Sequence, residues 1–228
     1  MRFYEMHVHP EVELVKMIEF SKMLGWSGMC LVFRDLKDLE EARRTLKDVR
    51  IVDIYFGLKI EAKKPEDVRR LAAPARRKAD LILVHGGDME VNRAAVETPE
   101  VDVLSHPEFG REEDSGFDHV MAKLAKENNV AIEFNFRELL LSYKKTRSAV
   151  LAHLVRNAKL VRKYNVPFVL TSGAVSSWDM RGPSDMISFG KVLGLDHSAC
   201  KDAMTGTILQ ENRKRNSGKW VMPGVEVE

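Results

Sequence analysis

The chain alternates along most of its length between short apolar runs and segments whose apolar residues recur at helical spacing. Runs such as GMCLVF at 28–33 and LILV at 81–84 are apolar throughout, which is typical of strands buried on both faces. The segment after nearly every run places its apolar residues three and four positions apart, as an amphipathic helix does. Strict alternation of strand and helix predicts an α/β protein with a parallel sheet.

The pattern contains about seven strands, and so many units favour a closed barrel over an open sheet. We expect strands at 3–8, 28–33, 50–60, 79–84, 101–105, 130–136 and 168–170. We expect helices at 11–24, 38–46, 65–78, 88–96, 116–128 and 142–164, and extra C-terminal helices at 183–193 and 197–215. Residues 217–228 are expected to form a tail, and residues 1–228 are interpreted as one domain.

Composition limits the class of protein. A formal net charge of +2 on 228 residues is too small for a protein that binds nucleic acid over its whole surface, so only local basic patches are candidates. The N-terminal residues show no apolar signal core, and no apolar run is long enough to cross a bilayer. With two cysteines there is no Cys-based zinc motif. We therefore expect a cytoplasmic protein with no membrane partner.

Polar residues stand where several predicted strands end, which is where α/β barrels place their functional groups. Four histidines share this position, and neutral imidazoles suit zinc, iron or manganese. The alternative is a set of buried histidines that bond to backbone around a filled barrel mouth, and the residues alone do not decide between the two. The candidates are His7, His9, His85 and His106, with Glu61, Glu108 and Glu133 as further carboxylates and Asn135 and Ser172 as orienting groups.

Three long segments carry a family resemblance. LVHGGDMEVNRAAVETPEVDVLSHPE (83–108), DSGFDHVMAKLAKENNVAIEFNFRELL (114–140) and VLTSGAVSSWDMRGPSD (169–185) resemble the archaeal ribonuclease P protein component 3 family, the counterpart of the eukaryotic 30-kDa ribonuclease P subunit. The resemblance runs from about Met1 to Gln210. It implies a TIM-like, distorted barrel, which agrees with the alternation pattern.

That family is similar in turn to the polymerase-and-histidinol-phosphatase (PHP) phosphoesterases, which hold metal with His-x-His after the first strand and a late Asp-x-His. His7-x-His9 fits the first element, but Ser172-Gly173-Ala174-Val175 stands where the superfamily has Ser-Asp-Ala-His. Two ligands are missing, so the resemblance implies that the histidines are a relic, that the chain binds no metal and that it has no catalytic residue. A metal-dependent PHP-type phosphoesterase remains the alternative.

The resemblance implies a subunit that binds RNA and protein partners. The RNA subunit of ribonuclease P and its Mg²⁺ would remove the 5′ leader of precursor tRNA, while this chain, with ribonuclease P protein component 2 and the other ribonuclease P proteins, supports that RNA. Cationic side chains would neutralise phosphates without reading sequence. The candidates for RNA binding are Arg93, Arg111, Arg137, Arg181, Lys123, Lys159 and Lys191. For each, a structural ion pair is the alternative, such as Arg93 with Asp88 or Asp102.

Overall fold

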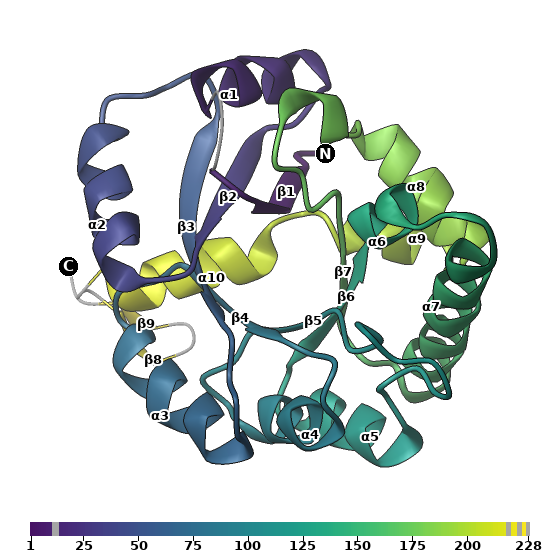
Figure 1. Ribbon diagram of the computed structural model, residues 1–228. Helices are drawn as coiled ribbons and strands as arrows, with labels where there is room; N and C mark the ends of the chain where they lie inside the picture. The colour runs from purple at the N-terminus through teal and green to yellow at the C-terminus, as the bar shows by residue number, and fades with distance from the viewer. Residues whose placement is uncertain (11–13, 218–219, 223–224, 227–228) are drawn as a thin grey trace.

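Seven parallel strands form the centre of the protein in a computed structural model that describes residues 1–10, 14–217, 220–222 and 225–226 (Figure 1). Each strand pairs with the next one along the chain, so the sheet order is β1-β2-β3-β4-β5-β6-β7. The strands are β1 (Tyr4–Val8), β2 (Gly28–Phe33), β3 (Asp53–Ile60), β4 (Leu81–His85), β5 (Val103–Ser105), β6 (Ala131–Asn135) and β7 (Phe168–Thr171).

The first and last strands meet and close the sheet into a barrel. A single parallel bridge joins Val8 to Ala174, and the His9 amide donates to the Ala174 carbonyl at 2.8 Å. The carboxyl group of Glu5 also accepts the Ser172 amide, at 3.1 and 3.2 Å. Fewer residue pairs join these two strands than join the other neighbouring strands, so the barrel is distorted at this seam. The predicted TIM-like distorted barrel of about seven parallel strands is confirmed.

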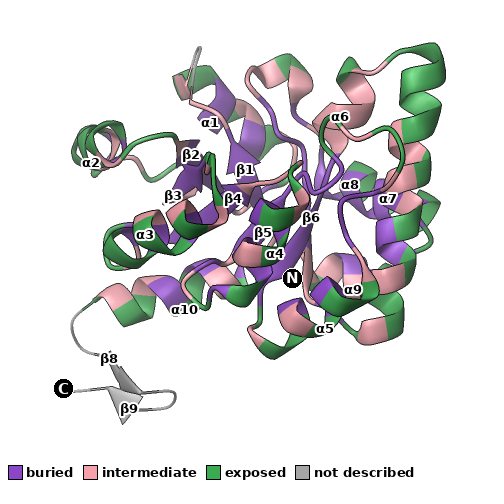
Figure 2. Cartoon of the chain, turned by 60° about the horizontal axis from the view of Figure 1, so that its bottom comes forward, coloured by how far each residue is buried: buried purple, intermediate pink, exposed green. Residues whose placement is uncertain are grey.

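Helices surround the barrel and turn their buried faces towards the strands (Figure 2). Extra helices follow β7, as predicted, and Gly206 divides the helix expected at 197–215 into two. The helices are α1 (Leu14–Met23), α2 (Leu36–Thr45), α3 (Pro65–Ala75), α4 (Met89–Glu97), α5 (His119–Glu127), α6 (Phe136–Leu141), α7 (Lys144–Tyr164), α8 (Pro183–Val192), α9 (His197–Asp202) and α10 (Thr207–Asn216), with a 3₁₀ turn η1 (Ser177–Asp179).

Local chemistry explains several helix boundaries. The Asp88 side chain accepts the Glu90 and Val91 amides and so caps α4. Pro65 is at the first position of α3, where the missing N–H costs nothing. The short helix α6 was not predicted, and the Asn135 side chain caps it by accepting the Arg137 amide.

The barrel interior changes from apolar at the N-terminal ends of the strands to polar at the C-terminal ends. Tyr4, Met6 and Leu83 belong to an apolar cluster inside the barrel. Helix α10 covers this end: Leu209 joins the same cluster, and the Asn212 amide donates to the Asp80 carbonyl at 3.0 Å. The C-terminal ends of the strands hold a second group of buried polar side chains, which includes His7, Ser105 and Glu133.

The predicted tail is partly extended. Strands β8 (Trp220–Met222) and β9 (Val225–Glu226) pair antiparallel, while residues 218–219, 223–224 and 227–228 lie outside the described part of the chain. The predicted start of the first helix, at 11–13, also lies outside it. None of the described helices combines the length and the apolar character that a membrane span requires.

Candidate functional site

The four predicted histidines gather at the polar end of the barrel. Ring centroids are 4.7 Å apart for His7 and His9, 5.9 Å for His7 and His106, and 5.3 Å for His85 and His106. They come from three strand ends and the loop after β1, which supports the prediction that strand ends converge in a parallel barrel.

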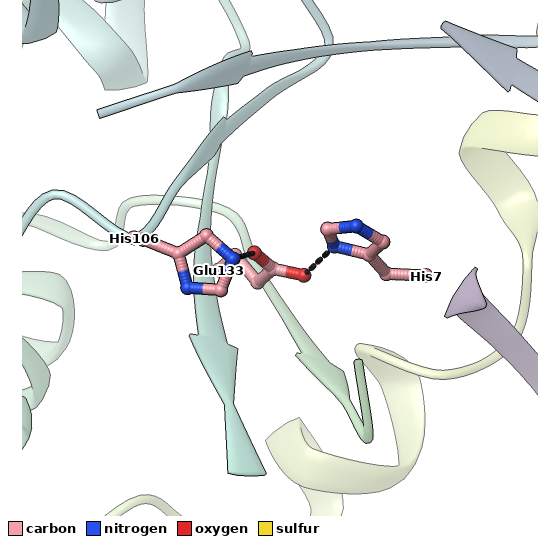
Figure 3. A group of neighbouring side chains, drawn as sticks. All are labelled: His7, His106 and Glu133. Atoms are coloured by element: carbon pink, nitrogen blue, oxygen red, sulfur yellow. Dashed lines mark hydrogen bonds and ion pairs between the residues drawn. The ribbon is translucent and has the colours of Figure 1, made fainter. Parts of the chain in front are cut away.

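Glu133 lies between His7 and His106 (Figure 3). His7 Nδ1 is 2.7 Å from Glu133 Oε1, and His106 Nε2 is 3.7 Å from Glu133 Oε2. One ligand atom from each of the three residues lies within 4.8 Å of the others, and all three side chains are buried. His9 and His85 stand outside this closest triad.

The Glu133 carboxylate already receives several other donors from the barrel wall. Ser105 Oγ donates to Oε2, while Thr171 Oγ1 at 2.6 Å and Asn135 Nδ2 at 3.3 Å donate to Oε1. Burial opposes ionisation of this carboxyl, but the attraction of His7 and His106 and the donated hydrogen bonds outweigh it and hold its pKa well below the usual range. Glu133 is therefore a buried carboxylate whose two oxygens are both engaged by the protein.

Burial shifts the titration of the surrounding groups towards their neutral forms. It lowers the pKa of His106 and of His9 to about 3, and lowers that of His85 as well. It raises the pKa of Glu5 and of Glu108 to about 8. At neutral pH His9, His85 and His106 are thus neutral, and Glu5 and Glu108 are mostly protonated.

Gly173 tests whether a side-chain ligand fits where the PHP enzymes have one. Its φ is +61°, a conformation that residues with a Cβ adopt at a cost. A Cβ at this position would lie 2.6 Å from Asn135 Nδ2, so the Asn135 amide occupies the required space. Gly173 has no side chain that could ligate a metal, and both oxygens of Glu133 already accept hydrogen bonds from the protein. These two features argue against a catalytic metal centre of the PHP kind.

Three of the four arginines predicted to bind RNA form ion pairs within the protein. Arg93 pairs with Glu97 at 2.9 Å, one helical turn away, so the suggested pairing with Asp88 or Asp102 is wrong. Arg111 makes two bonds to Asp114, at 2.5 and 2.6 Å. Arg137 pairs with Asp179 at 3.0 Å.

The other four candidates form no ion pair with another residue of the described ranges. Arg181 donates to the carbonyls of Trp178 and Met180 and lies over the Phe136 ring at 5.2 Å. Lys123, Lys159 and Lys191 are exposed, as expected. RNA binding by all seven residues stays a prediction.

Sequence reasoning missed the donors that hold Glu133 and the burial of Lys59. Lys59 is 7% exposed and its Nζ lies 3.1 Å from Glu61 Oε1. Ser105, Glu133 and Thr171 lie on three neighbouring strands and point into the barrel. Their contact could not be predicted from the sequence, because it depends on the register between the strands.

Comparisons with known proteins agree over nearly the whole chain. The RNase P subunit p30 family model matches residues 2–217. Ribonuclease P protein component 3 of Methanosarcina mazei is 35% identical over 230 residues, with 99% of this chain and 95% of the relative covered. The protein of the same name from Methanothermobacter thermautotrophicus is 36% identical over 227 residues, covering 95% and 92%.

A solved structure gives the same result. A chain in the cryo-EM structure of archaeal ribonuclease P with mature tRNA is 31% identical, with a TM-score of 0.83 and coverage of 97% of this chain and 96% of that one. The match to the family model and the identity to full-length relatives show that this chain belongs to the RNase P subunit p30 family, together with the archaeal ribonuclease P protein component 3 proteins.

Proposed function

We propose that this chain is a protein subunit of ribonuclease P and supports the catalytic RNA in removing the 5′ leader from precursor tRNA. The observation that carries the proposal is the full-length structural match to a chain of an archaeal ribonuclease P solved with mature tRNA. Its partners would be the ribonuclease P RNA, ribonuclease P protein component 2 and the other ribonuclease P proteins, with precursor tRNA in the assembled enzyme. The proposal includes a cytoplasmic location.

The chain would contribute no catalytic residue and bind no metal of its own. Two features of the barrel mouth support this part of the proposal. Both oxygens of Glu133 accept hydrogen bonds from the protein, and a Cβ at Gly173 would meet the Asn135 amide, where the PHP enzymes have an acidic ligand. Mg²⁺ held by the RNA subunit would perform the hydrolysis. The protein's cations would neutralise crowded phosphates and so lower the Mg²⁺ concentration that the RNA needs to fold.

Precursor-tRNA cleavage at low Mg²⁺ tests the proposal. The RNA subunit and component 2 are assayed with and without this chain, and the chain alone is assayed with Mn²⁺ and Zn²⁺. We expect cleavage to require the RNA and to rise sharply when the chain is added. A chain that leaves RNA-driven cleavage unchanged but hydrolyses phosphate esters by itself would be a PHP-type phosphoesterase, and the proposal would fail.

A further inference from the structure

We propose that a groove at the N-terminal end of the barrel binds the phosphate backbone of the RNA. We call it the basic groove: a depression of about 790 Å³ between α7, α9 and the start of α10, with the end of α5 at its edge and the segment 166–169 on its floor. This inference rests on the proposed function and names a surface for it. The groove lies at the opposite end of the strands from the histidine cluster.

Four cations line the basic groove: Lys126 from α5, and Lys159, Arg162 and Lys163 from α7. All four side chains are exposed, and none forms an ion pair with another residue of the described ranges. Lys163 makes only a ring contact, with Nζ 5.4 Å from the Tyr164 ring centroid. Their positive charges are therefore available to a ligand.

The arginines near the strand ends are weaker candidates for phosphate binding than the cations of the basic groove, because they already form ion pairs. Arg111 and Arg137 already hold carboxylates at hydrogen-bond distance. To bind a phosphate they must first give up or share that partner, so much of the electrostatic gain is lost. A cation of the basic groove exchanges only water and mobile counterions, and counterion release drives the binding of nucleic acids.

The acidic residues of the groove narrow the placement of the RNA. Asp196 and Asp202 line the α9 side, while the four cations belong to the α5 and α7 side. The aspartates on the α9 side repel a phosphate, and the cations on the α5 and α7 side attract it. Lys159 and Lys163 are four residues apart on α7 and so share one face of the helix. The phosphate strand should therefore run along α7, from Lys163 towards Lys126.

The helix dipole of α7 explains the position of Arg162 and Lys163, but it does not explain all four cations of the basic groove. Both lie in the last turn of α7, where cations stabilise the helix dipole. That role leaves their charged groups free for a ligand, and it does not account for Lys126 on α5 or for Lys159 a turn earlier. The composition favours RNA over a protein partner, because lysine is depleted from protein interfaces and enriched where phosphates bind.

Two matched fourfold variants test the inference. The groove variant is Lys126→Gln, Lys159→Gln, Arg162→Gln and Lys163→Gln. The control variant is Lys37→Gln, Lys47→Gln, Lys63→Gln and Lys64→Gln, on α2 and the loops around β3, where the four lysines are also exposed. Each removes four positive charges, so the net charge of both becomes +2 − 4 = −2. Tm is measured first, and exposed substitutions of this kind change stability little.

Binding of the ribonuclease P RNA to each protein, together with component 2, is then measured over a range of salt concentrations. We expect the groove variant to bind at least about tenfold more weakly, and its salt dependence to lose roughly 0.7 to 0.9 logarithmic units of slope per lost phosphate contact. The control variant should keep the wild-type slope. A third variant with Arg in place of Lys126, Lys159 and Lys163 keeps the charge and should bind as wild type does.

Each outcome decides the question. Equal RNA binding by the groove and control variants overturns the inference, while stimulation of cleavage by the wild-type chain upholds the proposed function. Normal RNA binding with lost binding of component 2 makes the groove a protein surface and also overturns the inference. If the wild-type chain fails to stimulate cleavage, the proposed function fails, and the binding comparison still decides whether the groove holds RNA.

Discussion

Replacing Glu5 by glutamine should make the barrel less sensitive to alkaline pH. The Glu5 carboxyl is fully buried at the seam between β1 and β7, where it accepts the amides of Ser172 and His7. Burial is the main cause that raises its pKa from the ordinary value of 4.5 to about 8. The folded protein therefore keeps this group protonated at neutral pH and must ionise it inside the barrel at higher pH.

The sign and size of the effect follow from the two pKa values. Because the folded-state pKa is raised, the stabilising contribution is complete below pH 4.5 and is lost as pH rises through 8. Between pH 6.5 and 9 about 1.5 logarithmic units are lost, which is about 2 kcal/mol at 1.36 kcal/mol per unit. In a chain of this length that corresponds to a fall in Tm of roughly 4–8 °C.

Thermal unfolding at pH 6.5 and pH 9 measures the effect. The Glu5→Gln variant keeps a neutral acceptor of the same shape, so its Tm at pH 6.5 should stay close to that of wild type. Its fall in Tm at pH 9 should be about half of the wild-type fall, since Glu108 has the same raised pKa and remains. Glu112→Gln, at an exposed position, is the control. Equal falls for wild type and Glu5→Gln would refute the argument that burial controls this titration.

Four further predictions concern the barrel mouth. Gly173→Ala should destabilise the fold by more than the roughly 1–2 kcal/mol that a left-handed backbone costs, because the Asn135 amide fills the space of the new Cβ. Gly25→Ala is the control in urea unfolding, since its φ is also positive but nothing lies within 4 Å, and equal costs would contradict the packing argument. Glu133→Ala should cost about 3–5 kcal/mol, because His7 loses its buried partner. Glu133→Gln should weaken the acid dependence of Tm below pH 4.5, because a lowered folded-state pKa gives stability that is lost as pH falls, and an acid limb like that of wild type would argue against an ionised Glu133. Finally, removal of divalent metal with a chelator should leave Tm unchanged, and a fall of several degrees would reveal a bound ion at the histidine cluster.

The fold was largely predictable because each apolar run and each amphipathic segment is long enough to give a clear period. The short helix α6 escaped prediction, because FRELLL has too few residues to show helical spacing and follows β6 without a turn. The strand interiors were also undecided, since a run that is apolar on both faces does not reveal which side chains point inward. Lys59 is the example: its burial depends on its register with Leu83 in β4.

The candidate site was predicted in part for the same physical reason. Residues at strand ends converge in any parallel barrel, so the histidine cluster followed from the topology. Ion pairing does not follow from topology alone. For Arg111 and Arg137 the sequence left RNA binding and an ion pair as alternatives, because their partners depend on loop conformation and on contacts between distant segments. The basic groove likewise joins α5, α7 and α9 across long stretches of chain.

The seam between β1 and β7 has a consequence for biosynthesis. The two strands that close the barrel are the first and the last of the sheet to be translated. Until Ala174 leaves the ribosome, β1 has an unpaired edge, and unpaired edges attract other chains. Long-range closure of this kind also slows folding. A nascent chain that ends before β7 should therefore depend on chaperones. Ribosome pauses before that strand should increase aggregation far more than pauses after α8.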